Sequence, residues 1–458
     1  MSPTQPVTPG PARISLFVGK GGVGKSTLAA ATAVARAHAG DRVLLVSTDQ
    51  AHSVGDVLGV AVSPSGDRDA VPVLLDEGEA KLGPPHRHGG SAILDEGEAK
   101  LGPPHRHGVS AGRLDVLALD ALALLEAHWV DVVGVLAANL PESDLGLVAP
   151  EELSALPGVQ EVLGLHEVGE LADSGQWDRV VVDCASTADA MRMLTLPATV
   201  ALYAERSWPR HRRLSGIEDA RSAALVGLIE RISGAAEHLA ALLADDARVG
   251  AHLVLTAERV VAAEAVRTLG SLALAGVRVE DLIVNQILLQ DDSYVYTNLP
   301  AHPAFDWYAE RIAEQRTVLD ELDRVIGDVA MVLVPHLAGE PIGPKALGDL
   351  LDGSRRRDGS ALPGPVRPVV DRESGSGLGA VYRLRLELPQ VDSGALSLGR
   401  SGDDLVIGVG GTRRRVRLAS VLRRCTVMDA TLRGSELTVR FRPDPAVWPL
   451  SSGEEVRR

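Results

Sequence analysis

A glycine-rich octapeptide near the N-terminus constrains the fold more than any other feature of this 458-residue chain. Residues 19–26, Gly-Lys-Gly-Gly-Val-Gly-Lys-Ser, match the spacing G-x-x-x-x-G-K-[ST]. An apolar run at 14–18 precedes them, and residues 25–39, rich in Ala, Leu, Thr and Val, follow and end before Gly40. This order predicts a buried strand, a glycine loop and a helix. The apolar residues 42–47 predict a second strand that completes a βαβ unit.

Short apolar runs that recur along the chain predict the rest of a sheet. They lie at residues 180–182, 252–255, 282–284 and 329–334, and segments with helical spacing separate them. The alternation indicates an α/β fold with a doubly wound, mostly parallel sheet, which we expect to occupy residues 1–352. Two insertions rich in Ala and Leu, at about 114–175 and 203–246, predict a helical subdomain that either covers the sheet or binds a ligand.

The residue types of the octapeptide suit phosphate binding. Glycines free backbone N–H groups to point at an anion, and the N-terminus of the helix adds positive potential. Lys25 would place its charge on the β- and γ-phosphates, and Ser26 would offer its hydroxyl to Mg²⁺. These features predict a P-loop NTPase. The expected nucleotide-contacting residues of the loop are Gly21, Gly22, Val23, Gly24, Lys25, Ser26 and Thr27.

Lysine is rare in this chain, which has five lysines among its 46 basic residues. Two of the five, Lys20 and Lys25, belong to the octapeptide, which indicates that a compact ammonium group is needed there. Lys20 matches the deviant Walker A pattern K-G-G-x-G-K-[ST], in which this lysine reaches across a dimer interface to the partner's nucleotide. The alternative is a solvated loop lysine.

The sequence changes character after residue 352. Residues 353–377 have little periodicity and predict a linker. Polar and apolar residues then alternate in short runs at 382–388, 405–409, 415–418 and 437–441, which predicts a small antiparallel β-sandwich at 378–450. Its arginines form either a solvated face or a binding patch.

Residues 75–89 are repeated letter for letter at 94–108. Two identical copies with Gly-Pro-Pro at their centres indicate an exposed insertion and not a repeat architecture. The His-Arg-His triplets at 86–88 and 105–107 would either bind a metal or be solvated.

Composition narrows the class of protein. The net charge of −15 argues against broad contact with nucleic acid or an anionic membrane surface. No apolar leader is present, and no uncharged apolar run reaches the roughly 18–20 residues of a membrane span. The only cysteines, Cys184 and Cys425, supply neither a disulfide framework nor a C-x-x-C metal site. We therefore expect a cytoplasmic protein.

Several further motifs together resemble those of the ArsA-like ATPases, the family of the arsenite-pump ATPase and of the ATPase that targets tail-anchored membrane proteins. Residues 47–53, Ser-Thr-Asp-Gln-Ala-His-Ser, are similar to the family's S-T-D-P-A-H-S, and the resemblance implies that Asp49 orients the attacking water. Residues 157–161 resemble its P-G-x-x-E segment. The nucleotide implied by the family is ATP.

Residues 183–192 are similar to the family's switch segment D-T-A-P-T-G-x-T-L-R, with Ser186 in place of proline and Ala188 in place of glycine. The resemblance implies that Asp183 holds Mg²⁺ through water, and the alternative is a carboxylate that caps the next turn. Residues 284–286, Val-Asn-Gln, and the loop at 334–343 resemble the adenine site. Asn285 and Pro335 would then contact the base.

The C-terminal sandwich is similar to the small-heat-shock-like (α-crystallin-type) domain of actinobacterial relatives. The cysteine cluster of the arsenite pump is missing, so arsenite activation has no support in the sequence. The chain contains one phosphate loop, whereas the pump ATPase has two, and a trans-acting Lys20 then implies a homodimer.

The resemblance implies an Mg²⁺-dependent, ATP-hydrolysing homodimeric switch that captures or releases an unknown client, which could lie at a membrane. One alternative is a positioning ATPase of the ParA/MinD type. The other is a chaperone-like binding protein with a vestigial ATPase.

Overall fold

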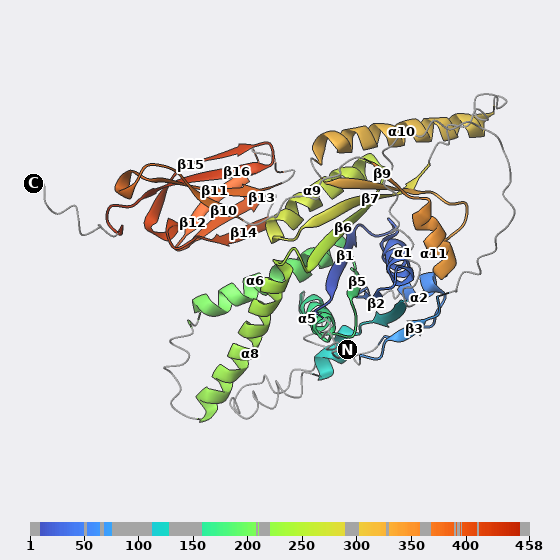
Figure 1. Ribbon diagram of the computed structural model, residues 1–458, viewed down its shortest axis with the longest axis horizontal. Helices are drawn as coiled ribbons and strands as arrows, with labels where there is room; N and C mark the ends of the chain where they lie inside the picture. The colour runs from blue at the N-terminus through green and yellow to red at the C-terminus, as the bar shows by residue number, and fades with distance from the viewer. Residues whose placement is uncertain are drawn as a thin grey trace, which may run out of the picture.

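The computed structural model describes residues 10–49, 53–64, 68–75, 112–127, 158–207, 209, 220–288, 302–326, 329–357, 368–388, 391, 394, 396–409 and 412–448. The described residues form an α/β body and a smaller all-β body beside it (Figure 1).

A nine-stranded sheet organises the α/β body (Figure 1). Seven strands run parallel to one another, and the two outermost strands, β3 and β9, run antiparallel to their neighbours. The parallel strands are β1, β2, β4, β5, β6, β7 and β8. The order across the sheet is β3 (Val71–Val73), β4 (Arg113–Ala118), β2 (Arg42–Ser47), β5 (Arg179–Asp183), β1 (Arg13–Gly19), β6 (Val249–Thr256), β7 (Val279–Ile287), β8 (Ala330–Pro335) and β9 (Arg355–Arg357). The predicted doubly wound, mostly parallel sheet is confirmed.

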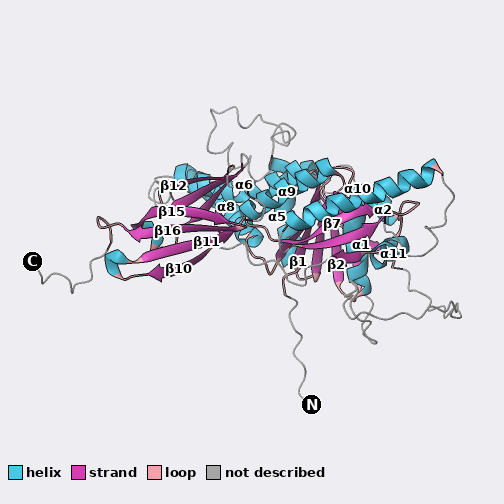
Figure 2. Cartoon of the chain, turned by 90° about the horizontal axis from the view of Figure 1, so that it is seen from above, coloured by secondary structure: helices cyan, strands magenta, loops and turns pink. Residues whose placement is uncertain are grey.

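Two groups of helices enclose this sheet (Figure 2). One group consists of α1 (Lys25–His38), α2 (Ser53–Leu58) and α11 (Pro344–Asp352). The other consists of α5 (Val159–Asp173), α6 (Thr187–Ser207), α8 (Ala220–Leu243), α9 (Arg259–Ala275) and α10 (Pro303–Val325). The strands are therefore buried on both faces, which explains why β1 and β2 are near-continuous apolar runs in the sequence.

The all-β body is a sandwich of two antiparallel sheets. The larger contains β10 (Val369–Ser374), β11 (Val381–Glu387), β16 (Glu436–Pro443) and β15 (Cys425–Arg433), and the smaller contains β12 (Leu396–Ser401), β13 (Asp404–Val409) and β14 (Thr412–Arg417). Buried apolar side chains such as Leu384, Ile407 and Phe441 lie between them. The predicted sandwich is confirmed.

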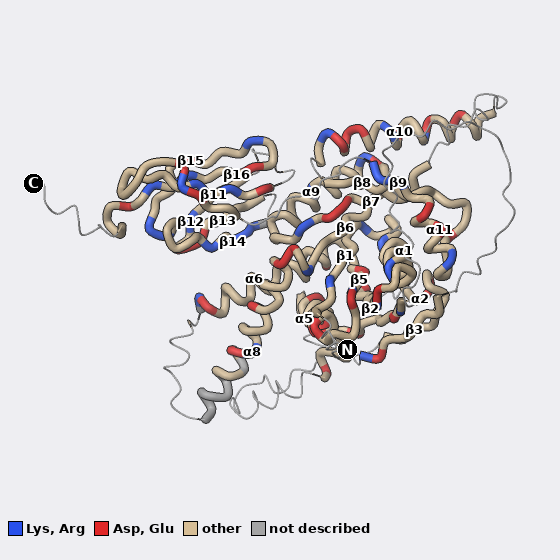
Figure 3. The backbone as a smooth tube through the Cα atoms, viewed as in Figure 1, with Lys and Arg blue, Asp and Glu red and all other residues tan. Residues whose placement is uncertain are grey.

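Basic and acidic residues are interspersed along the larger sheet (Figure 3), and its arginines pair with acidic side chains of the same sheet. Arg383 lies 3.1 Å from Asp371 of β10, and Arg440 lies 2.7 Å from Glu373. These pairs favour the solvated-face interpretation over a basic binding patch.

The sandwich is docked on the C-terminal end of α9. Leu274 of α9 is 1% exposed and belongs to the sandwich core. The Arg414 guanidinium of β14 donates a hydrogen bond to the Ala273 carbonyl at 2.9 Å, and Arg206 of α6 lies 3.5 Å from Asp404. The two bodies are therefore held by apolar, hydrogen-bond and ionic contacts.

Two expected boundaries are wrong. The insertion expected to be helical from residue 114 begins instead with β4, because Arg113–Ala118 pairs with β2 inside the sheet. The expected linker at 353–377 contains β9, which pairs with β8, and β10, which belongs to the sandwich. The duplicated segment lies outside the described residues apart from Leu75 at its start.

None of the helices among the described residues is long and apolar enough to cross a membrane.

Candidate nucleotide site

The sequence-predicted residues meet at one edge of the sheet. Gly19, Asp183 and Pro335 end β1, β5 and β8, Asp49 follows β2, and Asn285 lies near the end of β7. Because these strands are parallel, their carboxyl ends share one edge, which is where α/β proteins bind ligands.

The loop from β1 to α1 has the backbone that its glycines permit. Gly22 and Gly24 have φ of +81° and +90°, in the left-handed region. A Cβ atom at Gly24 would also lie 2.3 Å from the Asn285 Nδ2 atom. Lys25, the first residue of α1, is buried, and its ammonium donates to the Lys20 carbonyl at 3.3 Å. The loop is therefore folded over the N-terminus of α1.

Ser26 connects the loop to the segment after β2. Its hydroxyl lies 2.8 Å from that of Ser53, the first residue of α2 and the last residue of the S-T-D-Q-A-H-S motif. In the same region Thr48 donates both its backbone N–H and its hydroxyl to the Asp183 carbonyl, at 3.0 and 3.2 Å. The ends of β1, β2 and β5 are thereby held together.

Asp183 has the environment of a metal-binding carboxylate. Its side chain is 0% exposed, and neither carboxylate oxygen has a hydrogen-bond partner among the described residues. The pKa of Asp183 is raised to about 6: burial has the largest effect and raises it, the nearby Ser26 hydroxyl and Lys25 ammonium lower it, and the Asp49 carboxylate raises it. A buried carboxylate without a partner is costly, so these residues fit a cation or its bound water at this position.

Residues other than Asp183 cap the helix that follows it, α6. Ser186 and Asp189 form reciprocal hydrogen bonds at the start of α6: the Ser186 N–H donates to Asp189 at 3.2 Å, and the Asp189 N–H donates to the Ser186 hydroxyl at 3.3 Å. This is a capping box. Ser186, which departs from the family's proline, therefore stabilises the start of the helix.

The switch segment also contacts the P-G-x-x-E segment. Arg192 of α6 donates to Glu161 of α5 at 2.9 Å, and the pair raises the pKa of Arg192. Two motifs that are 31 residues apart in the sequence are thus joined by an ion pair.

Asn285 is bonded to the phosphate loop. Its Nδ2 atom donates to the Val23 carbonyl at 2.9 Å, and its Oδ1 atom accepts from the Gln286 N–H at 2.9 Å. Gln286 has φ of +58°, a conformation that costs energy for any residue except glycine. Gln315 of α10 supports this turn, because it donates to the Gln286 carbonyl and accepts from the Leu288 N–H, both at 2.9 Å.

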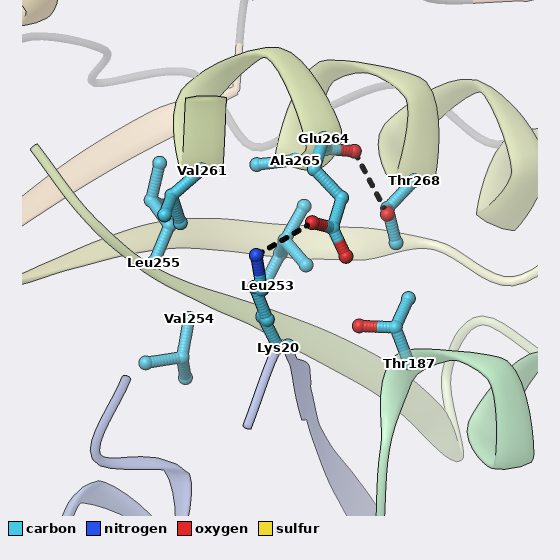
Figure 4. A pocket seen from close by; sticks show the side chains of 10 residues that line it. Lys20, Thr187, Leu253, Val254, Leu255, Val261, Glu264, Ala265 and Thr268 are labelled. Carbon is cyan, nitrogen blue, oxygen red and sulfur yellow. Dashed lines mark hydrogen bonds and ion pairs between the residues drawn. The ribbon is translucent and has the colours of Figure 1, made fainter. Parts of the chain in front are cut away.

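Lys20 makes an ion pair within its own subunit. Its ammonium lies 3.5 Å from the Glu264 carboxylate of α9, and Figure 4 shows the two side chains pointing toward each other. They line a small pocket together with residues of β6, α6 and α9.

Two contributors to this arrangement, Glu264 and Gln315, lie in no motif that would have identified them as site residues, and Ser53 lies in a quoted motif but had no role assigned to it. Each is positioned by a long-range contact. Gln50, Ala51, His52 and Pro157, all in quoted motifs, lie outside the described residues.

The fold and the strand-end residues define a P-loop NTPase-like protein. The chain belongs to the anion-transporting ATPase family, ArsA, whose sequence profile matches residues 12–67 and 109–352, more than half of the chain. A second profile, the HSP20-like domain found in ArsA, matches residues 379–441.

The chain is similar over most of its length to several curated proteins. It is 67% identical over 96% of its length to protein Rv2184c of Mycobacterium tuberculosis, of which it covers 99%. It is 31% identical over 95% of its length to the uncharacterized protein SCO2128 of Streptomyces coelicolor, again covering 99%. A putative arsenical pump-driving ATPase 1 of Aquifex aeolicus is 22% identical over 93% of this chain and 99% of that protein.

Proposed function

We propose that this protein is an Mg²⁺-dependent ATPase that works as a homodimeric switch and couples hydrolysis to capture or release of a client protein. The observation that best supports this is the buried, unpartnered carboxylate of Asp183 at the strand end next to the phosphate loop. A structural carboxylate in such a position would be hydrogen bonded.

Each residue of the site has a proposed role in binding or hydrolysing the nucleotide. The loop amides between Gly21 and Thr27 bind phosphate oxygens, and Lys25 neutralises the β- and γ-phosphates. Ser26 and Asp183 would hold Mg²⁺, Asp183 through water, and the ion would offset the charge on these phosphates. Asp49 orients the attacking water, and Lys20 contacts the nucleotide of the partner subunit.

The adenine end of the site lies at β7 and β8. Asn285 and Pro335 face this end in our proposal, with Asn285 joining the base site to the loop through its bond to Val23. Contact between the base and Asn285 would use the second N–H of the amide, because the first is engaged.

Family membership does not by itself identify the client. Relatives bear names such as arsenical pump-driving ATPase and ATPase GET3. Metalloid binding needs thiolates, and both cysteines are buried, with burial raising the pKa of the Cys184 thiol. We therefore propose a client other than a metalloid, and arsenite should leave the turnover rate unchanged.

The test is turnover and oligomeric state in two variants. Lys25→Ala should lower ATP turnover by about 100-fold or more, since it removes the phosphate-neutralising charge. Asp49→Asn should bind ATP and remain a nucleotide-bound dimer. Lys345→Ala is the control, because Lys345 pairs with Asp349 on α11 and is 76% exposed. Normal hydrolysis by either site variant would contradict the proposal.

A further inference from the structure

Lys20 is held toward α9 of its own subunit. Its ammonium is 3.5 Å from Glu264, and the two side chains are 48% and 34% exposed. Figure 4 shows Lys20 extending from the loop after β1, with Glu264 reaching down from α9 to meet it. Thr187, the first residue of α6, lines the same pocket.

The same residue connects to the buried lysine of the loop. The Lys20 carbonyl accepts a hydrogen bond from the Lys25 ammonium at 3.3 Å. The position of Lys20 is thus fixed by its backbone at Lys25 and by its side chain at Glu264. Glu264 is itself on a continuous stretch of α9, where the Thr268 hydroxyl donates to its carbonyl at 3.0 Å.

The proposed function requires a different position for this side chain. One ammonium cannot lie against Glu264 in its own subunit and against the phosphates in the partner at the same time. We infer that Glu264 is a positioning residue that retains Lys20 in its own subunit until the partner's nucleotide replaces the carboxylate. This inference rests on the proposed homodimeric function.

The strength of the contact suits such a role. An exposed ion pair shifts an equilibrium by about twofold to fivefold. A triphosphate carries several negative charges and replaces a single carboxylate readily. Because a dimer must release two such pairs, removing both should shift dimerisation by roughly fourfold to 25-fold. Glu264 therefore raises the nucleotide concentration at which the protein dimerises, the dimerisation threshold, and does not prevent dimerisation.

The first experiment compares dimerisation of wild type and Glu264→Gln. Sedimentation is measured at fixed protein concentration and increasing Mg²⁺ and ATPγS, a slowly hydrolysed analogue. Because each dimer binds two nucleotides, Glu264→Gln should dimerise at a nucleotide concentration about twofold to fivefold lower than wild type. The matched control is Glu314→Gln. It removes a 2.8 Å ion pair between Glu314 of α10 and Arg259 of α9, and its dimerisation should match that of wild type.

A second measurement examines the contact in nucleotide-free protein. An amine-reactive reagent labels lysines, and mass spectrometry follows each of the few sites separately. Lys20 should label faster in Glu264→Gln than in wild type, whereas Lys345, which pairs with Asp349, should label at the same rate in both. Thermal unfolding of the two proteins verifies that the variant is folded.

The outcomes separate the two proposals. A wild type that dimerises with nucleotide, together with an unchanged threshold or unchanged Lys20 labelling in Glu264→Gln, overturns the role of Glu264 and leaves the proposed function standing. A wild type that stays monomeric at saturating nucleotide overturns the proposed dimer and this inference with it.

Discussion

Gly24 is the residue at which the phosphate loop has the least freedom. Its φ of +90° disfavours every side chain, and the space where a Cβ would lie is taken by the Asn285 amide. The loop conformation and the strand-end amide are therefore fixed by one close approach, which only glycine allows.

Gly24→Ala should consequently weaken both folding and binding. The left-handed conformation costs an alanine about 1–2 kcal/mol, and the displaced Asn285 loses its bond to Val23. We expect the free energy of unfolding to fall by about 1–3 kcal/mol and ATP affinity to fall at least about tenfold. Urea unfolding and nucleotide titration measure these changes. Gly21→Ala has open space for its Cβ, and equal destabilisation in that variant would contradict the explanation.

His252 is a half-buried histidine on β6, outside the phosphate loop. Its Nδ1 atom lies 2.7 Å from Asp281, and its ring stacks on Phe17 with centroids 4.8 Å apart. Burial lowers the pKa of His252, but Asp281 and Glu280 raise it more, so that the net pKa lies above the ordinary 6.5. The folded protein therefore holds this proton more tightly than the unfolded chain does.

The sign of the resulting pH dependence follows from this difference. The stabilisation is fully present below pH 6.5 and is lost as the pH rises through the folded-state pKa. In His252→Gln that contribution should disappear. The stability difference between wild type and variant should then shrink as the pH rises above 6.5, as measured by urea unfolding at several pH values. A difference that grows with pH would show that His252 is neutral in the fold.

At the scale of elements, α9 joins the two bodies. Its N-terminal half carries Glu264, which contacts the phosphate loop, and its C-terminal end is covered by the sandwich. Arg414 lies against the last carbonyls of this helix, where a positive charge is favourable, and burial lowers the pKa of its guanidinium to about 10.

Removing this side chain should loosen the end of the helix. Arg414→Ala loses a charged hydrogen bond worth about 1.5–3 kcal/mol, so we expect roughly tenfold or faster hydrogen exchange at the Gly276 and Val277 amides, which bond the last turn of α9. Arg415→Ala, an exposed neighbour on the same strand, is the control. Unchanged exchange in Arg414→Ala would contradict the docking role.

Elements could be predicted from the sequence where a local pattern suffices. The glycine loop and strands β1 and β2 follow from contiguous residues, and their bounds agree within two residues. Strand β4 was missed because it contains Asp115, whose buried carboxylate accepts from Arg113 and from Trp177, 62 residues away. Strand β9 consists of three arginines. Glu264 could not be predicted either, because its partner Lys20 is distant in the sequence and no local pattern joins the two residues.

At the scale of the whole molecule, nucleotide binding and the sandwich should be linked through the shared residue Leu274. A ligand at 100 times its dissociation constant adds about 2.7 kcal/mol of stability to the body that binds it. We expect Mg²⁺ and ATP to slow hydrogen exchange in β6 and α9, and also in β13 and β14, which contact α9. Protection restricted to the α/β body would show that the two bodies unfold independently.

The outer strands of the large sheet restrict how a second copy of this chain can attach. Among the described strands, β3 at one end is three residues long with Pro72 at its centre, which cannot donate a backbone hydrogen bond. At the other end β9 consists of arginines, and Arg357 is engaged by Asp323 of α10. Each of these strands is only three residues long, so neither presents a long row of backbone N–H groups to a strand of another copy. Two copies are therefore not expected to assemble by extending this large sheet through its described outer strands, and an assembly of the α/β bodies would form through side chains and loops, where it can also come apart.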